Sequence, residues 1–250
     1  MIYNISSYKN LLNEFLFRGF EFNDFTQLKS RKVKSVLLRH DVDNDVIAAK
    51  EMAYVEAENG VKSTYFFMIN SPMYNLFSRH NYLAVMEILS MGHFLGLHYD
   101  QGFDQMRRYN TDCTLKNIER DCQYLEDSFG SKIAAVSFHQ PSSCLLKSSA
   151  FRLTKRVNTY DKAALMDYAY FSDSNRSLDY NSLINHISSA INDSHTGNIQ
   201  LLIHPMWWVY EQQATTKVWN NVMENALNYA MPQLSETERA FGPTRKISVT

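Results

Sequence analysis

The sequence has few cysteines, no excess of charge of either sign and no long hydrophobic run. Its three cysteines, Cys113, Cys122 and Cys144, are odd in number and form no CxxC pair. Neither a disulfide framework nor a thiolate zinc site is therefore indicated. A formal net charge of -1 over 250 residues also gives no cationic excess of the kind that binds nucleic acid or anionic membranes. We expect no nucleic-acid partner.

The sequence also lacks the signals of export and of membrane insertion. No basic segment followed by an apolar one starts at Met1, and no uncharged apolar run reaches the roughly 18 residues that a membrane helix needs. We therefore expect a protein without a transmembrane segment in the cytoplasm, a reducing compartment that the cysteine pattern also fits. A hydrophobic content of 45% in 250 residues is ordinary for one globular core.

Short apolar runs alternate with longer segments of helical period along most of the chain. This alternation is typical of β-α units around a parallel sheet or barrel. We expect residues 1–32 to form a helical preface packed on the barrel, 33–234 the barrel itself and 235–250 a polar tail. The expected strands are 35–43, 62–70, 94–99, 133–139, 163–171 and 198–204, and the expected helices are 11–17, 45–60, 73–91, 111–129 and 218–234.

Charged residues stand at the end of the first expected strand, the place where barrel enzymes build their sites. The segment reads Arg39-His40-Asp41-Val42-Asp43, and period-two alternation places Arg39, Asp41 and Asp43 on one face. Two carboxylates this close repel unless they share a cation, so one could bind a metal while the other acts as a base. An isolated DxD is more often a solvated strand end before a helix.

Three further expected strands end in histidine, at His98, His139 and His204. One such histidine is more often structural, but three beside a DxD strand are difficult to attribute to chance. An aspartate-histidine set without cysteine favours zinc, iron, cobalt or nickel over magnesium or calcium. Trp207 and Trp208 follow His204, and tryptophans at a barrel mouth commonly stack on sugar rings, although they are more often core.

The segments RHDVD (39–43), GHFLGLH (92–98) and LLIH (201–204) resemble motifs of the polysaccharide deacetylase family, the NodB-homology domain of carbohydrate esterase family four. The resemblance runs from about residue 33 to 208. It implies a single domain with a distorted (β/α) barrel of about seven parallel strands. It also implies that Asp41 is the catalytic base, Asp43 and His98 are metal ligands, and His204 is the general acid.

The chain departs from the family pattern at two motifs. Gly102 stands where the family has its second metal-binding histidine, and His139-Gln140-Pro141 stands where an arginine precedes a proline. We infer that His139 has entered the metal sphere, with Asp100 as the alternative third ligand. We also infer that Arg39 pairs with the base. Asp173, in the segment YFSDS, corresponds to the aspartate that tunes the acid His204.

The resemblance implies hydrolysis of an acyl group, most simply N-acetyl, from a sugar with a divalent metal, zinc first and iron, cobalt or nickel next. Asp41 would take a proton from water, His204 would protonate the departing amine or hydroxyl, and the metal with the backbone N–H of Tyr99 would stabilise the oxyanion.

The segments SFHQPS and LLIHPMWW are also similar to a divergent WbmS-like subgroup encoded with bacterial O-antigen and surface-polysaccharide genes. We expect a saccharide or a lipid- or nucleotide-linked sugar as substrate, and the similarity to this subgroup does not settle which one. Two alternatives stay open. One is a metal-dependent deformylase or amidase acting on another substrate. The other is a degenerate domain that binds saccharide through Trp207, Trp208 and Tyr99 without turnover.

Overall fold

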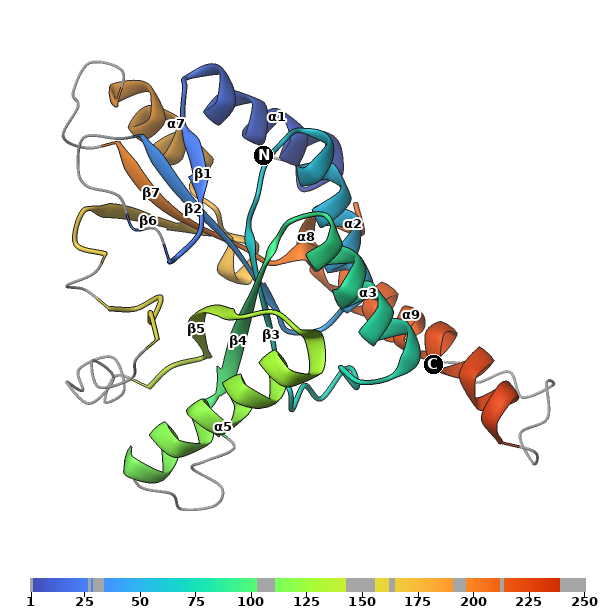
Figure 1. Cartoon of the computed structure of the whole chain (residues 1–250). Helices are drawn as coiled ribbons and strands as arrows, with labels where there is room; N and C mark the ends of the chain where they lie inside the picture. Colours follow the sequence, from blue (N-terminus) through green and yellow to red (C-terminus); the bar gives the residue numbers. More distant parts are fainter. Residues whose placement is uncertain are drawn as a thin grey trace.

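The computed structural model describes residues 2–26, 28, 34–102, 111–142, 156–161, 165–190, 197–211 and 214–238. These residues form a single α/β domain around a curled parallel sheet, a half-barrel with helices on its outside (Figure 1). In the described residues the strand order is β5-β4-β3-β2-β7-β6, and β1 pairs with β2 off this path. The expected single-domain distorted (β/α) barrel with parallel strands is confirmed.

The strands of this sheet are short, and most follow the expected apolar runs. They are β1 (Glu21–Asn23), β2 (Ser35–Val42), β3 (Thr64–Phe67), β4 (Phe94–Asp100), β5 (Ile133–His139), β6 (Tyr168–Ser172) and β7 (Asn198–Ile203). β1 was not expected from the sequence. β3 is shorter than the expected 62–70, and β6 begins later than the expected 163–171, of which residues 163 and 164 lie outside the described residues.

The helices confirm the expected alternation, with shifted ends. They are α1 (Ile5–Phe17), α2 (Val46–Glu58), α3 (Arg79–Ser90), α5 (Thr111–Phe129), α7 (Tyr180–Ser189), α8 (Pro205–Val209) and α9 (Thr215–Thr237), with a 3-10 turn η2 at Ser174–Arg176. The expected helix over 73–91 is wrong in its first turns. There the Ser71 hydroxyl and the Asn75 side chain accept hydrogen bonds from the backbone N–H groups of Met73 and Phe77, a turn geometry that competes with helix.

β2 is the centre of the sheet, and every one of its residues is buried. One edge of β2 pairs with β7, whereas the other edge pairs first with β1 and then, from Arg39 to Val42, with β3. Its carboxyl end is therefore enclosed by neighbouring strands on both sides. Such full burial explains the apolar run Val36-Leu37-Leu38 in the first half of the strand.

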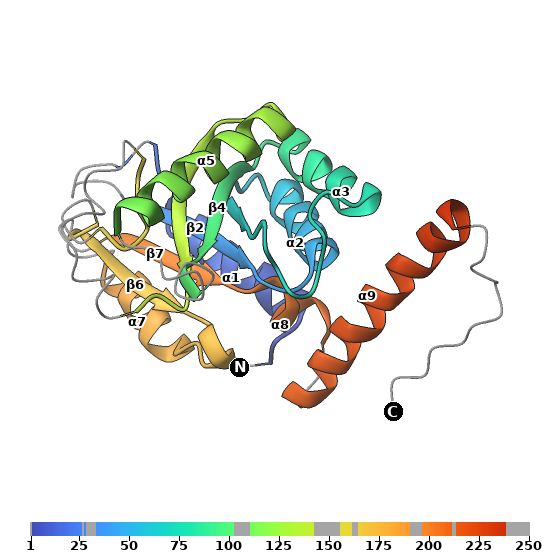
Figure 2. The same ribbon diagram turned by 90° about the horizontal axis from the view of Figure 1, so that it is seen from below.

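The helices cover the sheet with two main apolar clusters. The first joins α1, α7 and α8 to β2 and β7, and the second joins α2, α3 and α5 to β3, β4 and β5. α9 runs along the outside of the fold (Figure 2), and among its residues only Val218 and Val222 are buried. No helix in the described part of the chain has the length and apolar character of a membrane span.

The predicted division at residues 32 and 234 stays a prediction. α1 contributes four buried side chains to the first apolar cluster, at Tyr8, Leu11, Leu12 and Phe15. Most of the predicted polar tail, residues 239–250, lies outside the described residues.

Candidate metal centre and active site

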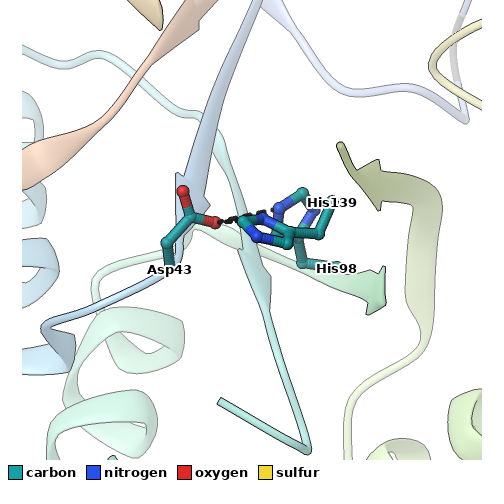
Figure 3. Close-up of side chains that lie close together, drawn as sticks. All are labelled: Asp43, His98 and His139. Carbon is teal, nitrogen blue, oxygen red and sulfur yellow. Dashed lines mark ion pairs between the residues drawn. The ribbon is translucent and has the colours of Figure 1, made fainter. Parts of the chain in front are cut away.

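Asp43, His98 and His139 come from three strand ends and converge on one point (Figure 3). Asp43 follows β2, His98 lies in β4 and His139 ends β5. Asp43 Oδ1 lies 2.9 Å from His98 Nε2 and 3.3 Å from His139 Nδ1. One ligand atom from each side chain lies within 4.8 Å of the others. Parallel pairing places the carboxyl ends of these strands at one edge of the sheet, which explains the convergence.

The geometry of these atoms fits a shared cation. Ligand atoms that bind one divalent ion at about 2.0–2.2 Å lie roughly 3.0–3.6 Å from one another. Asp43 Oδ1 is buried and, among the described residues, has no partner with hydrogen-bond geometry, although two imidazoles stand beside it. Burial raises the pKa of the Asp43 carboxyl, but His139 and His98 lower it more, and the pKa lies well below its usual range. The carboxylate is therefore ionised and ready to bind metal.

Asp41 stands beside this group but is held differently. Its Oδ2 accepts hydrogen bonds from Arg39 Nη2 at 3.0 Å and from Ser137 Oγ at 3.1 Å. Its Oδ1 is buried and has no hydrogen-bond partner among the described residues. One oxygen is thus anchored while the other is left for a proton or a water. The expected pairing of Arg39 with Asp41 is present.

Arg39 is fully buried, which is costly for a guanidinium unless it is paired. Burial lowers its pKa, but the Asp41 carboxylate and the hydroxyl of Tyr160 raise it more, so the pKa lies above its ordinary value. Its Nη2 also donates to Tyr160 Oη at 3.2 Å. The arginine therefore remains charged and fixes the orientation of Asp41.

His204 and Asp173 form a second pair on the other side of Asp43. His204 Nδ1 lies 2.6 Å from Asp173 Oδ1, and His204 Nε2 lies 3.7 Å from Asp43 Oδ2. The backbone N–H of His204 donates to both carboxylate oxygens of Asp173 at 3.0 Å. Burial lowers the pKa of His204, but Asp173 raises it more, to about 9. The imidazole is thus protonated near neutral pH and points Nε2 towards the centre.

Trp208 completes that pair in a role that the sequence analysis missed. Its Nε1 donates to Asp173 Oδ2 at 2.8 Å, and its ring packs on Tyr3 and Tyr8 with centroids 4.8 and 5.3 Å away. The side chain is fully buried, so its ring has no face open to a sugar in this structure. The sequence contained a signal for this contact. Pro205 starts a helix, and Trp208 stands four residues after His204, a spacing that places two side chains on one face of a helix.

The other two predicted sugar contacts are also covered by protein. Trp207 is 7% exposed and packs edge-on against Trp219, and Tyr99 is 5% exposed and packs against Phe138. Strand alternation explains the position of Tyr99, whose side chain points away from the face that carries His98. Neither ring is open for stacking. The oxyanion role of the Tyr99 backbone N–H stays a prediction.

Ser137 and Tyr160 are contacts of this site that the sequence analysis also missed. Ser137 lies two residues before His139 on β5, so alternation could have placed both on the inner face. Tyr160 had no such signal. Asp100, the alternative third ligand, lies outside the convergent group, and its Oδ1 accepts the backbone N–H of Gly102 at 2.8 Å.

No protein-family model matches the sequence, and no curated protein matches it. Similar solved structures include a family 4 carbohydrate esterase from Streptomyces lividans, with 14% identity over 78% of this chain and 87% of that chain and a TM-score of 0.45. Peptidoglycan deacetylase PdaC from Bacillus subtilis shares 13% identity over 86% of this chain and 100% of that chain, with a TM-score of 0.44.

A CE4 family pseudoenzyme from Bacillus anthracis shares 12% identity over 78% of this chain and 61% of that chain, with a TM-score of 0.40. At such identities and TM-scores the likeness is too weak to assign an activity to this chain.

Proposed function

We propose that this protein is a metal-dependent hydrolase of the polysaccharide-deacetylase type, which removes an acyl group from an amino sugar. The supporting observation is the convergence of Asp43, His98 and His139. This group lies beside Asp41, whose Oδ1 has no hydrogen-bond partner among the described residues, and beside His204, whose pKa is raised. Two imidazoles and one carboxylate form a donor set that suits zinc, with iron, cobalt and nickel as alternatives. The acyl group we propose is N-acetyl. The substrate we propose is a saccharide or a lipid- or nucleotide-linked sugar of bacterial O-antigen or surface-polysaccharide synthesis.

A divalent ion bound at this site lowers the pKa of water and polarises an acyl carbonyl. The chain itself supplies the proton transfers. Asp41 accepts the proton of the attacking water at Oδ1, the oxygen that no described residue engages. Arg39 and Ser137 hold the opposite oxygen and so fix the orientation of the carboxylate. Such a positioned base contributes roughly 10²–10⁴-fold to a rate.

His204 acts as the acid in this proposal. Its Nδ1–H is held by Asp173, which leaves the Nε2 proton for the departing amine. Because Asp173 raises the pKa of His204 to about 9, the acid form predominates at neutral pH. A neutral amide substrate needs such an acid, because without a proton the nitrogen would have to leave as an anion, which is a poor leaving group.

The proposed activity is tested by release of acetate from N-acetylated sugars after reconstitution with zinc, cobalt or nickel. The wild-type protein should release acetate with at least one metal. Asp41→Asn should lower turnover by roughly 10²–10⁴-fold and keep the same metal content. Retained turnover in Asp41→Asn would remove Asp41 from the base role. Failure of the wild-type protein with every metal and sugar would leave saccharide binding without hydrolysis.

The third ligand is tested separately by elemental analysis of His139→Ala and Asp100→Ala. We expect His139→Ala to lose the metal and Asp100→Ala to retain it, because His139 alone of the two lies in the convergent group. The reverse result would assign the third ligand to Asp100.

A further inference from the structure

A second cavity adjoins the candidate active site. It has a volume of about 330 Å³ and lies between α9, α3 and the segment that follows β2. That segment contributes Asn44 and Asp45, α3 contributes His80, and α9 contributes Tyr229 and Gln233. The volume is at the small end of the roughly 300–1,000 Å³ typical of small-molecule sites. It suits one or two sugar-sized rings.

Asn44 and Asp45 connect this cavity to the reaction centre. Both residues also line the small cavity formed with Asp41, Asp43 and His204. Consecutive Cα atoms are about 3.8 Å apart, so the Cα atoms of Asp43 and Asp45 are separated by no more than about 7.6 Å. A substrate whose acyl group lies at Asp43 therefore reaches the cavity with its neighbouring ring.

The lining has the mixed character that a sugar ring needs. Apolar side chains, among them Val222, Ala226 and Ala230, alternate with amides and hydroxyls around the cavity. The Tyr229 ring stacks on His80, with centroids 5.3 Å apart and planes 26° from parallel, and Gln233 Nε2 meets His80 Nδ1. A sugar presents C–H faces to apolar surfaces and hydroxyls to polar groups at its edges.

Charge decides which part of a substrate the cavity can take. No described residue that lines it is a lysine or an arginine, and the acidic one is Asp45. A phosphate or carboxylate would need cationic donors, which proteins supply through arginine and lysine. The anionic end of a nucleotide- or lipid-linked sugar therefore does not fit here, whereas an uncharged ring does.

We propose that the cavity between α3 and α9 is the subsite for an uncharged sugar ring adjacent to the one that carries the acyl group. This inference rests on the proposed function for the position of the acyl group. It makes α9 part of the substrate site, although the helix follows the last strand of the sheet. It also places the phosphate of any linked substrate outside this cavity.

The test is a binding measurement on metal-free protein with two uncharged probes, N,N′-diacetylchitobiose and N-acetyllactosamine. Ala230→Phe should fill the cavity, and Asn228→Phe is the matched control because it adds the same ring at an exposed position of α9. By saturation-transfer NMR and calorimetry, we expect the wild type and Asn228→Phe to bind at least one probe alike. Ala230→Phe should bind it at least about tenfold more weakly.

Ala226→Phe, one turn earlier on the same lining, should show the same loss, and thermal melts check that each variant is folded. Unchanged affinity in both folded filling variants, or no binding of either probe to the wild type, overturns the proposal. So does a uridine diphosphate sugar that competes with the probe and loses its affinity in Ala230→Phe.

The failure of this subsite can be distinguished from the failure of the proposed function. Probe binding that Ala230→Phe weakens, in a protein that releases no acetate with any metal, supports the subsite and contradicts the hydrolase. Acetate release from the disaccharide with a kcat/KM that Ala230→Phe leaves unchanged supports the hydrolase and contradicts the subsite.

Discussion

Similar residues lie on the two faces of β2, but they differ in how far their hydrogen-bonding groups are satisfied. On the inner face, Arg39 donates to Asp41. Asp41 and Asp43 both lie beside His98. On the outer face, His40 meets Glu56 of α2 at 2.6 Å. Each face thus combines a buried acid with histidine. Two adjacent residues of β2 take part, His40 on the outer face and Asp41 on the inner face. Only their surroundings differ.

The outer cluster is closed around Glu56, which is fully buried. Its Oε1 accepts from the Tyr8 hydroxyl and contacts His40, and its Oε2 accepts from Ser63 Oγ at 2.5 Å and Tyr65 Oη at 2.9 Å. Burial raises the pKa of Glu56, but His40 lowers it more, to about 2. Both oxygens are satisfied by α1, β2 and β3, so the cluster ties helices to sheet.

The inner cluster is open. Asp41 Oδ1, Asp43 Oδ1 and His98 Nδ1 are buried without hydrogen-bond partners among the described residues, whereas on the outer face His40 Nδ1 is the one such atom around Glu56. Unsatisfied buried groups cost free energy, so their concentration at one point indicates a site that a ligand completes. A buried carboxylate with satisfied oxygens indicates structure, and one with unsatisfied oxygens indicates function.

Among the variants that test this difference between the inner and outer clusters, Asp43→Asn should have the largest effect. Loss of the carboxylate that touches both imidazoles should remove bound metal and lower turnover by at least about 10³-fold, about 4 kcal/mol. Elemental analysis and acetate release measure the two quantities. Glu56→Gln, refolded and assayed beside it, should keep its metal. Near-stoichiometric metal in Asp43→Asn would contradict the division between the faces.

Glu56→Gln should instead affect stability. It removes the charged acceptor of the Tyr8, Ser63 and Tyr65 hydroxyls and should cost about 3 kcal/mol in unfolding free energy, since a hydrogen bond to a charged group contributes about 1.5–3 kcal/mol. Urea denaturation measures this loss. Glu58→Gln is the matched control, because Glu58 is exposed in its pair with Lys9 and should cost less than about 1 kcal/mol. Equal losses in the two variants would show that the outer cluster does not stabilise the fold.

The stabilising effect of Glu56 should also depend on pH. Its pKa is lowered from 4.5 in the unfolded chain to about 2 in the fold, so the folded state binds fewer protons between these values. The contribution is therefore complete above pH 4.5 and is lost as pH falls towards 2, by about 3 kcal/mol. The difference in unfolding free energy between the wild type and Glu56→Gln should narrow over this range. A difference that stays constant would contradict the assignment.

Trp208→Phe should have the smallest effect. It removes the indole donor that holds Asp173 and should slow kcat about tenfold, near the 1.5 kcal/mol of a weak charged hydrogen bond. Metal content should not change. Trp207→Phe is the control, because it alters a neighbouring buried ring that makes no contact with Asp173 among the described hydrogen bonds. Equal kcat losses in both variants would reduce the role of Trp208 to packing.

Much of the candidate metal centre could be predicted from the sequence, for a simple reason. Strand alternation assigns Arg39, Asp41 and Asp43 to one face, and parallel strands bring their carboxyl ends to one edge. These rules are local, so a histidine at the end of an apolar run can be placed at this edge of the sheet from the sequence alone. The boundaries at Asn75 and the whole of β1 could not be predicted, because turn hydrogen bonds and pairing with β2 decide them.

The remainder depends on contacts between distant parts of the chain. Ser137 is 96 residues from the Asp41 that it holds, Tyr160 is 121 residues from Arg39, and Trp208 is 35 residues from Asp173. No local period links such pairs.

The sequence by itself thus determined that the acids and the histidines stand at the ends of parallel strands, at one edge of the sheet. Only the tertiary structure decided which oxygens of those acids have no hydrogen-bond partner among the described residues and that the Trp208 indole donates to Asp173. It alone also placed α9 beside α3. The physical reason is that side-chain packing and hydrogen-bond satisfaction are settled between elements, after each element has formed.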